Sequence, residues 1–223
     1  MPSAIALFAR APELGKVKTR LARTRGDEFA LALYRAMLGD TLELMRRARE
    51  ERELRLLVFL SPDESELTGW RGETRSQGDG DLWTRLLRAD ARLREEGFER
   101  IVFIGADSPD LPLALLGAAF DCLEERPVVV GPSLDGGFYL LGSARRLPDE
   151  VFQQVPVSSR DTLAHLTQNL RKLAGLPGWD YRTLAAWRDV DDETDLQLLL
   201  ERLRQNPHAA PRCRAFLLEQ GVL

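Results

Sequence analysis

Residues 4–18 read AIALFARAPELGKVK, a stretch in which an apolar run passes directly into a short cationic loop. Ala4–Ala9 has the length and apolar character of a buried strand. The loop places Lys16 and Lys18 near the end of that strand, and Gly15 can adopt backbone conformations closed to other residues. We therefore expect a strand of a sheet whose carboxyl end carries positive charge.

Further strand-length apolar runs occur at Leu54–Leu60, Ile101–Ile104 and Val128–Val130, and segments with helical spacing lie between them. This alternation predicts a three-layer α/β/α fold with a mostly parallel sheet. After a break in the rhythm, Phe138–Leu141 predicts a strand of different orientation, so the sheet is expected to be mixed. A length of 223 residues fits a single domain over 1–223. Ligands of such sheets bind beyond the carboxyl ends of the strands.

Composition excludes several classes of protein. The chain has 31 basic and 35 acidic side chains, a net charge of −4, which argues against a general nucleic-acid partner. Its two cysteines and two histidines lack the spacing of a zinc site or a disulfide framework. The sequence shows neither a signal-peptide pattern nor an apolar stretch long enough to cross a membrane, so we expect a cytoplasmic protein.

The first candidate site is the loop after the first strand. Lys16, Lys18 and Arg20 place three cations within five positions, which suits a polyphosphate ligand. A Walker A loop needs glycine immediately before its lysine, and Val17 stands there instead. The alternative is a basic surface loop without a ligand.

The second candidate is Asp107, which follows the strand Ile101–Ile104. A carboxylate beside a phosphate-binding loop would repel the ligand unless a divalent cation lay between them, and Mg²⁺ takes carboxylate and phosphate oxygens together. We therefore expect Asp107 to be a metal ligand. The alternative is that Asp107 or Ser108 caps the following helix.

The third candidate is the acidic segment 189–195. Asp189 and Asp191 alternate about Val190, so in an extended segment both carboxylates point to one side and can complete a metal site. Asp192 or Thr194 can instead cap the helix that follows, an alternative that explains 192–195 better than Asp189.

Two glycine-rich stretches remain. The segment 78–82, GDGDL, lacks the third glycine of a dinucleotide fingerprint because Trp83 stands there, so we reject a Rossmann cofactor site. In the segment 131–139, GPSLDGGFY, Gly136 and Gly137 allow close approach of a ligand, and Asp135 can accept hydroxyl hydrogen bonds. The alternative is a tight turn before a hairpin.

Together these motifs resemble the DUF2064 family of proposed bacterial glycosyltransferases. The resemblance covers most of the chain and rests on the following segments: 8–12 FARAP, 15–21 GKVKTRL, 80–82 GDL, 105–112 GADSPDLP, 131–142 GPSLDGGFYLLG and 189–191 DVD. It implies the nucleotide-diphospho-sugar transferase fold, also called glycosyltransferase-A, which is Rossmann-like and shared with nucleotidyltransferases that act on molybdenum-cofactor precursors and phospholactate. Fold alone does not fix the reaction.

The resemblance also implies roles for individual residues of these motifs. Lys18 and Asp107 would be catalytic; Arg10, Gly15, Lys16, Lys18, Arg20 and Asp81 would bind the nucleotide; Asp135, Gly136, Gly137 and Tyr139 would face the sugar or acceptor; Asp107, Asp189 and Asp191 would hold Mg²⁺ or Mn²⁺.

The leading interpretation is a metal-dependent, glycosyltransferase-like enzyme that uses a nucleotide sugar or a nucleoside triphosphate and a small-molecule acceptor. The alternatives are a nucleotidyltransferase and a non-catalytic nucleotide-binding module. The last is motivated by the single carboxylate in Asp107-Ser108-Pro109, where metal-dependent sugar transferases carry an Asp-any-Asp triplet.

Overall fold

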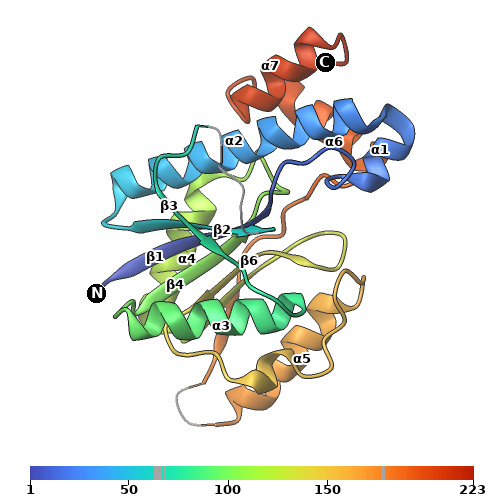
Figure 1. Cartoon of the computed structure of the whole chain (residues 1–223). Coiled ribbons are helices and arrows are strands. Elements are labelled where there is room, and N and C mark those ends of the chain that lie inside the picture. Colours follow the sequence, from blue (N-terminus) through green and yellow to red (C-terminus); the bar gives the residue numbers. More distant parts are fainter. Residues whose placement is uncertain (63–66, 68, 177–178) are drawn as a thin grey trace.

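The computed structural model describes residues 1–62, 67, 69–176 and 179–223. Within them, seven strands form one sheet between layers of helices (Figure 1). The strands are β1 (Ser3–Arg10), β2 (Arg55–Ser61), β3 (Glu73–Ser76), β4 (Arg100–Gly105), β5 (Val128–Pro132), β6 (Phe138–Ser143) and β7 (Tyr181–Thr183). The helices are α1 (Thr19–Arg25), α2 (Asp27–Glu51), α3 (Leu82–Glu95), α4 (Leu113–Glu125), the 3-10 helix η1 (Asp149–Phe152), α5 (Thr162–Ala174), α6 (Glu193–Gln205) and α7 (Pro211–Glu219).

The strand order is β3-β2-β1-β4-β6-β5-β7. Every neighbouring pair is parallel except those that involve β6, which runs antiparallel to both β4 and β5. The predicted α/β fold with a mostly parallel mixed sheet is confirmed, and Phe138–Leu141 is the strand of different orientation.

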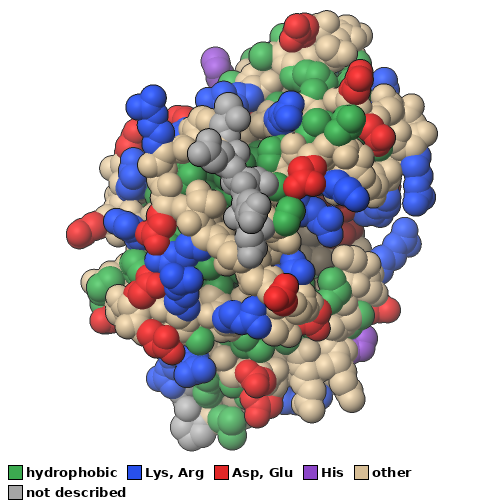
Figure 2. Space-filling view, in the orientation of Figure 1, with side chains coloured by type: hydrophobic (Ala, Val, Ile, Leu, Met, Phe, Trp, Pro, Cys, Tyr) green, Lys and Arg blue, Asp and Glu red, His purple; other side chains and the backbone are tan. Residues whose placement is uncertain are grey.

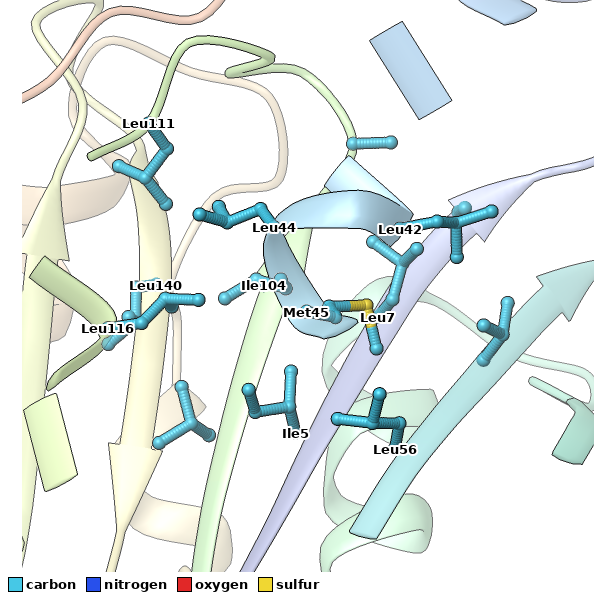
Figure 3. Close-up of a cluster of buried hydrophobic side chains, with 14 of the residues drawn as sticks. Ile5, Leu7, Leu42, Leu44, Met45, Leu56, Ile104, Leu111, Leu116 and Leu140 are labelled. Atoms are coloured by element: carbon cyan, nitrogen blue, oxygen red, sulfur yellow. The ribbon is translucent and has the colours of Figure 1, made fainter. Parts of the chain in front are cut away.

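The strands β1, β2 and β4 bury both of their faces. Along β1, Ile5 and Leu7 point to α2 and α4, while Ala4 and Ala6 point to α3 and α5. Figure 3 shows Ile5 and Leu7 against Met45 of α2. Burying a side chain of this size contributes about 1.5–3 kcal/mol, which explains why these strands read as continuous apolar runs.

A third apolar cluster lies on the outer side of α2, where α6 and α7 pack. Where α2 meets α7, the buried Asp40 of α2 accepts hydrogen bonds from the backbone N–H groups of Arg212 (2.9 Å) and Cys213 (2.9 Å). These groups belong to the first turn of α7 and have no partner within their own helix. The side chain of Asp40 in α2 thus provides hydrogen-bond acceptors for the first backbone N–H groups of α7. Burial raises the pKa of this carboxyl group.

Two strands, β3 and β7, are not predicted from the sequence. β3 and β7 are short strands at the two edges of the sheet, and most of their side chains are polar or partly exposed. Edge strands need no apolar alternation on both faces, so neither leaves a hydrophobic signal. The first loop is also shorter than expected, because α1 begins at Thr19 and includes Arg20.

The surface carries charge of both signs. Figure 2 shows acidic and basic side chains interspersed over one face, as the small net charge leads one to expect. In the part of the chain that the structure describes, no helix combines the length and the hydropathy needed to span a membrane.

Candidate functional site

The carboxyl ends of the parallel strands meet at one edge of the sheet, where the loops after β1, β4 and β5 carry Lys18, Asp107 and Asp135. Because β6 runs the other way, its first residue, Phe138, lies at the same edge. A cavity of about 700 Å³ opens there. It is lined by carboxylates (Asp107, Asp135, Asp189, Asp191, Asp192, Asp195), arginines (Arg20, Arg160, Arg188), aromatic rings (Phe8, Trp83, Phe103, Phe138, Tyr139) and smaller groups that include Ser158, Ser159 and Gly137.

The chain returns along this edge after β7. The N–H of Trp187 donates to the carbonyl of Pro132 (3.0 Å), and the N–H of Leu134 donates to the carbonyl of Trp187 (3.1 Å). Two residues before Asp192, the N–H of Val190 donates to the carbonyl of Asp107 (2.9 Å). These backbone bonds carry Asp189 and Asp191 to the loops after β4 and β5, so segments far apart in sequence share one cavity.

Lys18 lies at the point where the loops converge. Its Nζ donates to Oδ1 of Asp107 (2.5 Å) and to Oδ1 of Asp191 (2.8 Å), and its side chain is only 4% exposed. The residue adopts the left-handed conformation, with φ 47°, immediately before α1. Burial acts to lower the pKa of Lys18, but the charges and hydrogen bonds of Asp107 and Asp191 outweigh it and hold that pKa above its usual value.

Asp191 pairs with a second cation. Its Oδ2 accepts from the guanidinium of Arg20 at 2.7 Å. Burial alone would raise the pKa of Asp191, but Lys18 and then Arg20 lower it below the ordinary value. The carboxylate is therefore ionised at neutral pH and shared between the first loop and α1.

Asp189 has a different environment although it is two residues away. Its Oδ1 accepts from the hydroxyl of Ser133 (3.0 Å), and no described cation forms an ion pair with it. Burial, followed by the negative charges of Asp135 and Asp191, raises the pKa of Asp189 to about 6. The two residues of the predicted pair therefore differ: Asp191 lies beside the cations Lys18 and Arg20, whereas Asp189 lies beside the acids Asp135 and Asp191.

The directions of the carboxylate oxygens show which of these groups could share a metal ion. Asp107 and Asp191 each direct Oδ1 at one atom, the Nζ of Lys18, so the two can share a single cation. Among the described residues no group of three or more His, Cys, Asp or Glu side chains is arranged to hold a metal. Two carboxylates fit Mg²⁺ or Mn²⁺ where phosphate oxygens and water complete the coordination.

Another part of the cavity lining is an aromatic wall formed by Phe8, Trp83, Phe103 and Phe138. Trp83 stacks on Phe152 (4.7 Å between ring centroids) and Phe138 (6.1 Å), and its Nε1 donates to the carbonyl of Val155 (2.7 Å). Phe8 meets the edge of Phe103 at 5.5 Å. In the sequence, Trp83 stands where a dinucleotide fingerprint has its third glycine. In the structure its ring is buried and packs against Phe138 of the aromatic wall and against Phe152.

The glycine-rich segment 131–139 is a hairpin turn between β5 and β6 that also lines the cavity through Asp135, Gly137 and Tyr139. Gly136 does not line it. A Cβ at Gly136 would lie 2.1 Å from the carbonyl oxygen of Arg160, and its φ is +96°. The space beside Gly136 is therefore taken by the chain itself, where we expected a ligand.

Five predicted nucleotide-binding residues lie outside the cavity lining, and one of them, Lys18, contacts it only through Asp107 and Asp191. Arg10, the last residue of β1, and Lys16 of the first loop are exposed, and Gly15 has the positive φ that was anticipated, +71°. Asp81 is the N-cap of α3, where it accepts from the N–H of Thr84 (2.9 Å). Asp192 likewise caps α6, which confirms the capping interpretation of that residue.

Sequence reasoning missed two arginines of the cavity. Arg160 and Arg188 line it, and neither forms an ion pair with the part of the chain that the structure describes. Arg188 directly precedes Asp189, so its place was readable once that segment was expected at the site. Arg160 follows a serine pair in a loop, and no pattern in the sequence marks it.

Comparisons with known proteins agree with this architecture. A family model described as "Uncharacterized protein conserved in bacteria (DUF2064)" matches residues 43–159, just over half of the chain. A search of curated proteins found no match.

Solved structures extend the similarity over nearly the whole chain. A crystal structure from Desulfovibrio desulfuricans G20, provisionally named as a nucleotide-diphospho-sugar transferase, has 27% identity over 99% of this chain and 96% of that chain, with a TM-score of 0.86.

More distant structures share the fold alone. A 4-diphosphocytidyl-2C-methyl-D-erythritol synthase from Anaerococcus prevotii DSM 20548 has 11% identity over 91% of this chain and 99% of that chain, with a TM-score of 0.59. A cytidylyltransferase from Leptospira borgpetersenii serovar Hardjo-bovis has 13% identity over 99% and 95%, with a TM-score of 0.57. The expected nucleotide-diphospho-sugar transferase fold is thereby confirmed.

Proposed function

The chain belongs to the DUF2064 family, and from its cavity we propose that it is a transferase whose donor is a nucleotide sugar or a nucleoside triphosphate. The observation that carries the proposal is the convergence of Lys18, Asp107 and Asp191 on one point beyond the carboxyl ends of the strands. Ligands of open α/β sheets bind at this edge. The names of the similar structures, which include a nucleotide-diphospho-sugar transferase and a cytidylyltransferase, support the same class of donor.

Lys18 and Arg20 are the proposed phosphate contacts. Arg20 lines the cavity, and Asp191, which also lines it, pairs with both Lys18 and Arg20. Charge-assisted hydrogen bonds to phosphate are among the stronger polar contacts. Arg160 and Arg188 supply further positive charge that no described ion pair neutralises. Arg10, Gly15, Lys16 and Asp81 would take part where the nucleotide extends past the cavity, along the ends of β1 and β3.

Asp107 and Asp191 would hold Mg²⁺ or Mn²⁺, with Asp189 beside them. The ion would neutralise negative charge on the donor phosphates when it is bound. The chain's own part is to orient the donor with Lys18 and Arg20 and to keep the reacting groups in the cavity, where partial exclusion of water strengthens electrostatic contacts.

The preferred reaction is glycosyl transfer. The acceptor oxygen forms a bond to the sugar carbon, the bond from that carbon to the phosphate oxygen breaks, and a nucleoside diphosphate leaves with the electron pair. Asp135, Gly137 and Tyr139 line the cavity and are the proposed acceptor contacts. The aromatic wall suits the apolar face of a sugar ring.

Nucleotidyl transfer is the second candidate, favoured by the shared fold with cytidylyltransferases. In that reaction a substrate oxyanion attacks the α-phosphorus of a triphosphate and pyrophosphate leaves. The same phosphate contacts serve both reactions. A non-catalytic module is less well supported, because Asp191 provides beside Asp107 the second carboxylate that the sequence of the β4 loop lacks.

Thermal unfolding with a panel of ligands tests the donor. The panel contains ATP, CTP, GTP, UTP and common UDP- and GDP-sugars, each with and without Mg²⁺ or Mn²⁺. A ligand at about 100 times its Kd adds about 2.7 kcal/mol to the free energy of unfolding, a readily measured rise in Tm. We expect one nucleotide to raise Tm in a metal-dependent manner. If none does, with or without metal, the proposed function is wrong.

Product formation then separates an enzyme from a binding module. The nucleotide that raises Tm is incubated with a panel of sugar and phosphate acceptors, and release of nucleoside diphosphate or pyrophosphate is measured. We expect release by the wild type and its loss in Asp107→Asn. Tight binding without release for any acceptor favours the module, and release without an acceptor indicates hydrolysis.

A further inference from the structure

Lys18 occupies the position that a shared metal would need. Its ammonium nitrogen contacts Oδ1 of Asp107 and Oδ1 of Asp191, and these are the oxygens that the two carboxylates direct at a common point. A divalent cation bound there would need those oxygens at about 2.0–2.1 Å. Both cations cannot use them at once, because they would overlap in space and repel each other.

The backbone holds this arrangement in place. Lys18 lies between the first loop and α1 with a left-handed φ of 47°, a conformation that disfavours side chains with a Cβ. The backbone N–H of Val190 bonds to the carbonyl of Asp107, and the N–H of Asp191 bonds to Oδ2 of Asp195 (3.0 Å). The backbone of both aspartates is thus hydrogen-bonded in place, and the lysine side chain between their carboxylates is only 4% exposed.

Resting on the proposed function, we propose that Lys18 is the resident cation of this site and that a divalent cation replaces it only when donor phosphates draw the ammonium away. Phosphate oxygens offer the ammonium an alternative set of acceptors, so the lysine can leave the carboxylates without losing its own charge pairing. The two vacated oxygens then ligate the metal. Nucleotide and metal therefore bind together, and the protein alone has low affinity for the metal.

Mn²⁺ binding without any nucleotide tests this inference. Free Mn²⁺ is measured by electron paramagnetic resonance during titration of the wild type, Lys18→Met and Arg23→Ala. Arg23 is the matched control, since it is an exposed cation of α1 outside the cavity. We expect Lys18→Met to bind one Mn²⁺ at least tenfold more tightly than the wild type, and Arg23→Ala to match the wild type. Adding Asp107→Asn to Lys18→Met should remove the gain.

Equal affinity of the wild type and Lys18→Met, whether tight or weak, overturns the proposal, as does a gain that survives Asp107→Asn. If Lys18→Met does not fold, Lys18→Gln removes the charge with a polar group of similar length, and the same comparison applies. The result is independent of the nucleotide panel. A wild type that binds no nucleotide overturns the proposed function, while the Mn²⁺ comparison still reports whether Lys18 excludes the metal.

Discussion

Two parts of the cavity lining differ in the interactions that hold them: ion pairs in one and packing of aromatic rings in the other. On one side Asp107 and Asp191 line the cavity and form ion pairs with Lys18, so charges from three loops are held together. The other is the aromatic wall, in which Trp83 and its neighbours pack as part of a buried core that continues into α3 and α5. Charges that can exchange partners suit the binding and release of a charged donor. A packed wall cannot rearrange without losing stability, so it suits a fixed surface against which a substrate is oriented.

The largest expected effect is on the aromatic side. Trp83→Ala removes two stacking partners and the hydrogen bond to the carbonyl of Val155, and it leaves a cavity in the core. We expect a loss of about 3–5 kcal/mol in the free energy of unfolding, measured by urea denaturation. Trp83→Phe is the control, because it keeps a ring and loses the Nε1 donor, and it should lose much less. Equal losses in both variants would contradict the packing role of the ring and assign its stabilisation to the hydrogen bond with Val155.

The charged side should respond in ligand binding. Lys18→Ala is expected to weaken binding of the nucleotide identified by the thermal panel by about 1.5–3 kcal/mol, the range for hydrogen bonds to charged groups. Isothermal titration calorimetry measures this, with Arg23→Ala as the control that keeps wild-type affinity. Unchanged affinity in Lys18→Ala would show that Lys18 does not contact the phosphates. It would also contradict the contrast between a charged side that exchanges partners and an aromatic side that stays fixed.

The turn between β5 and β6 is tested at Gly136. Gly136→Ala places a Cβ against the backbone of Arg160 at a positive φ, so we expect a loss of about 1–3 kcal/mol in the free energy of unfolding. Gly137→Ala is the matched control. Its Cβ would approach the side chain of Asp135 at 3.2 Å, a neighbour that can move. Chemical denaturation of both variants decides the matter, and an equal loss would contradict a special role for the contact between Gly136 and Arg160.

The smallest expected effect concerns the outer edge of the charged side. Arg25 of α1 forms hydrogen bonds to both carboxylate oxygens of Glu193 at the start of α6 (2.6 and 2.8 Å), and these lower the pKa of Glu193 to about 2. Because the folded pKa lies below the unfolded value of about 4.3, the stabilisation is complete above that pH and is lost as the pH falls through about 2.

The pair is partly exposed, so we expect only about 0.3–1 kcal/mol. The free energy of unfolding of the wild type and Arg25→Met is compared at pH 6 and pH 3. The difference between them should shrink at the lower pH. A difference that is constant with pH would assign the effect of Arg25 to packing on Phe29 instead of the ion pair.

The sequence predicts most of the sheet because burial on both faces demands apolar residues. It predicts β1, β2, β4, β5 and the reversed β6, and it misses β3 and β7, whose edge positions demand no such pattern. At the site, Asp107 and Asp135 were predictable from their positions after strands. The contact of Lys18 with both Asp107 and Asp191 was not, since it depends on the path of residues 184–192 along the sheet edge, which only tertiary structure fixes.

That path also has a consequence for the order in which the site forms during synthesis. Lys18 leaves the ribosome early, whereas its partner Asp191 follows 173 residues later. A nascent chain that has already paired β1 with β2 and β4 still lacks the carboxylate that fixes Arg20 and shares the ammonium. Until the segment after β7 is synthesised and packs along the sheet edge, Lys18 and Arg20 therefore lack the negative charge of Asp191. If the proposed donor binds through Lys18 and Arg20, its binding requires that this late segment has docked.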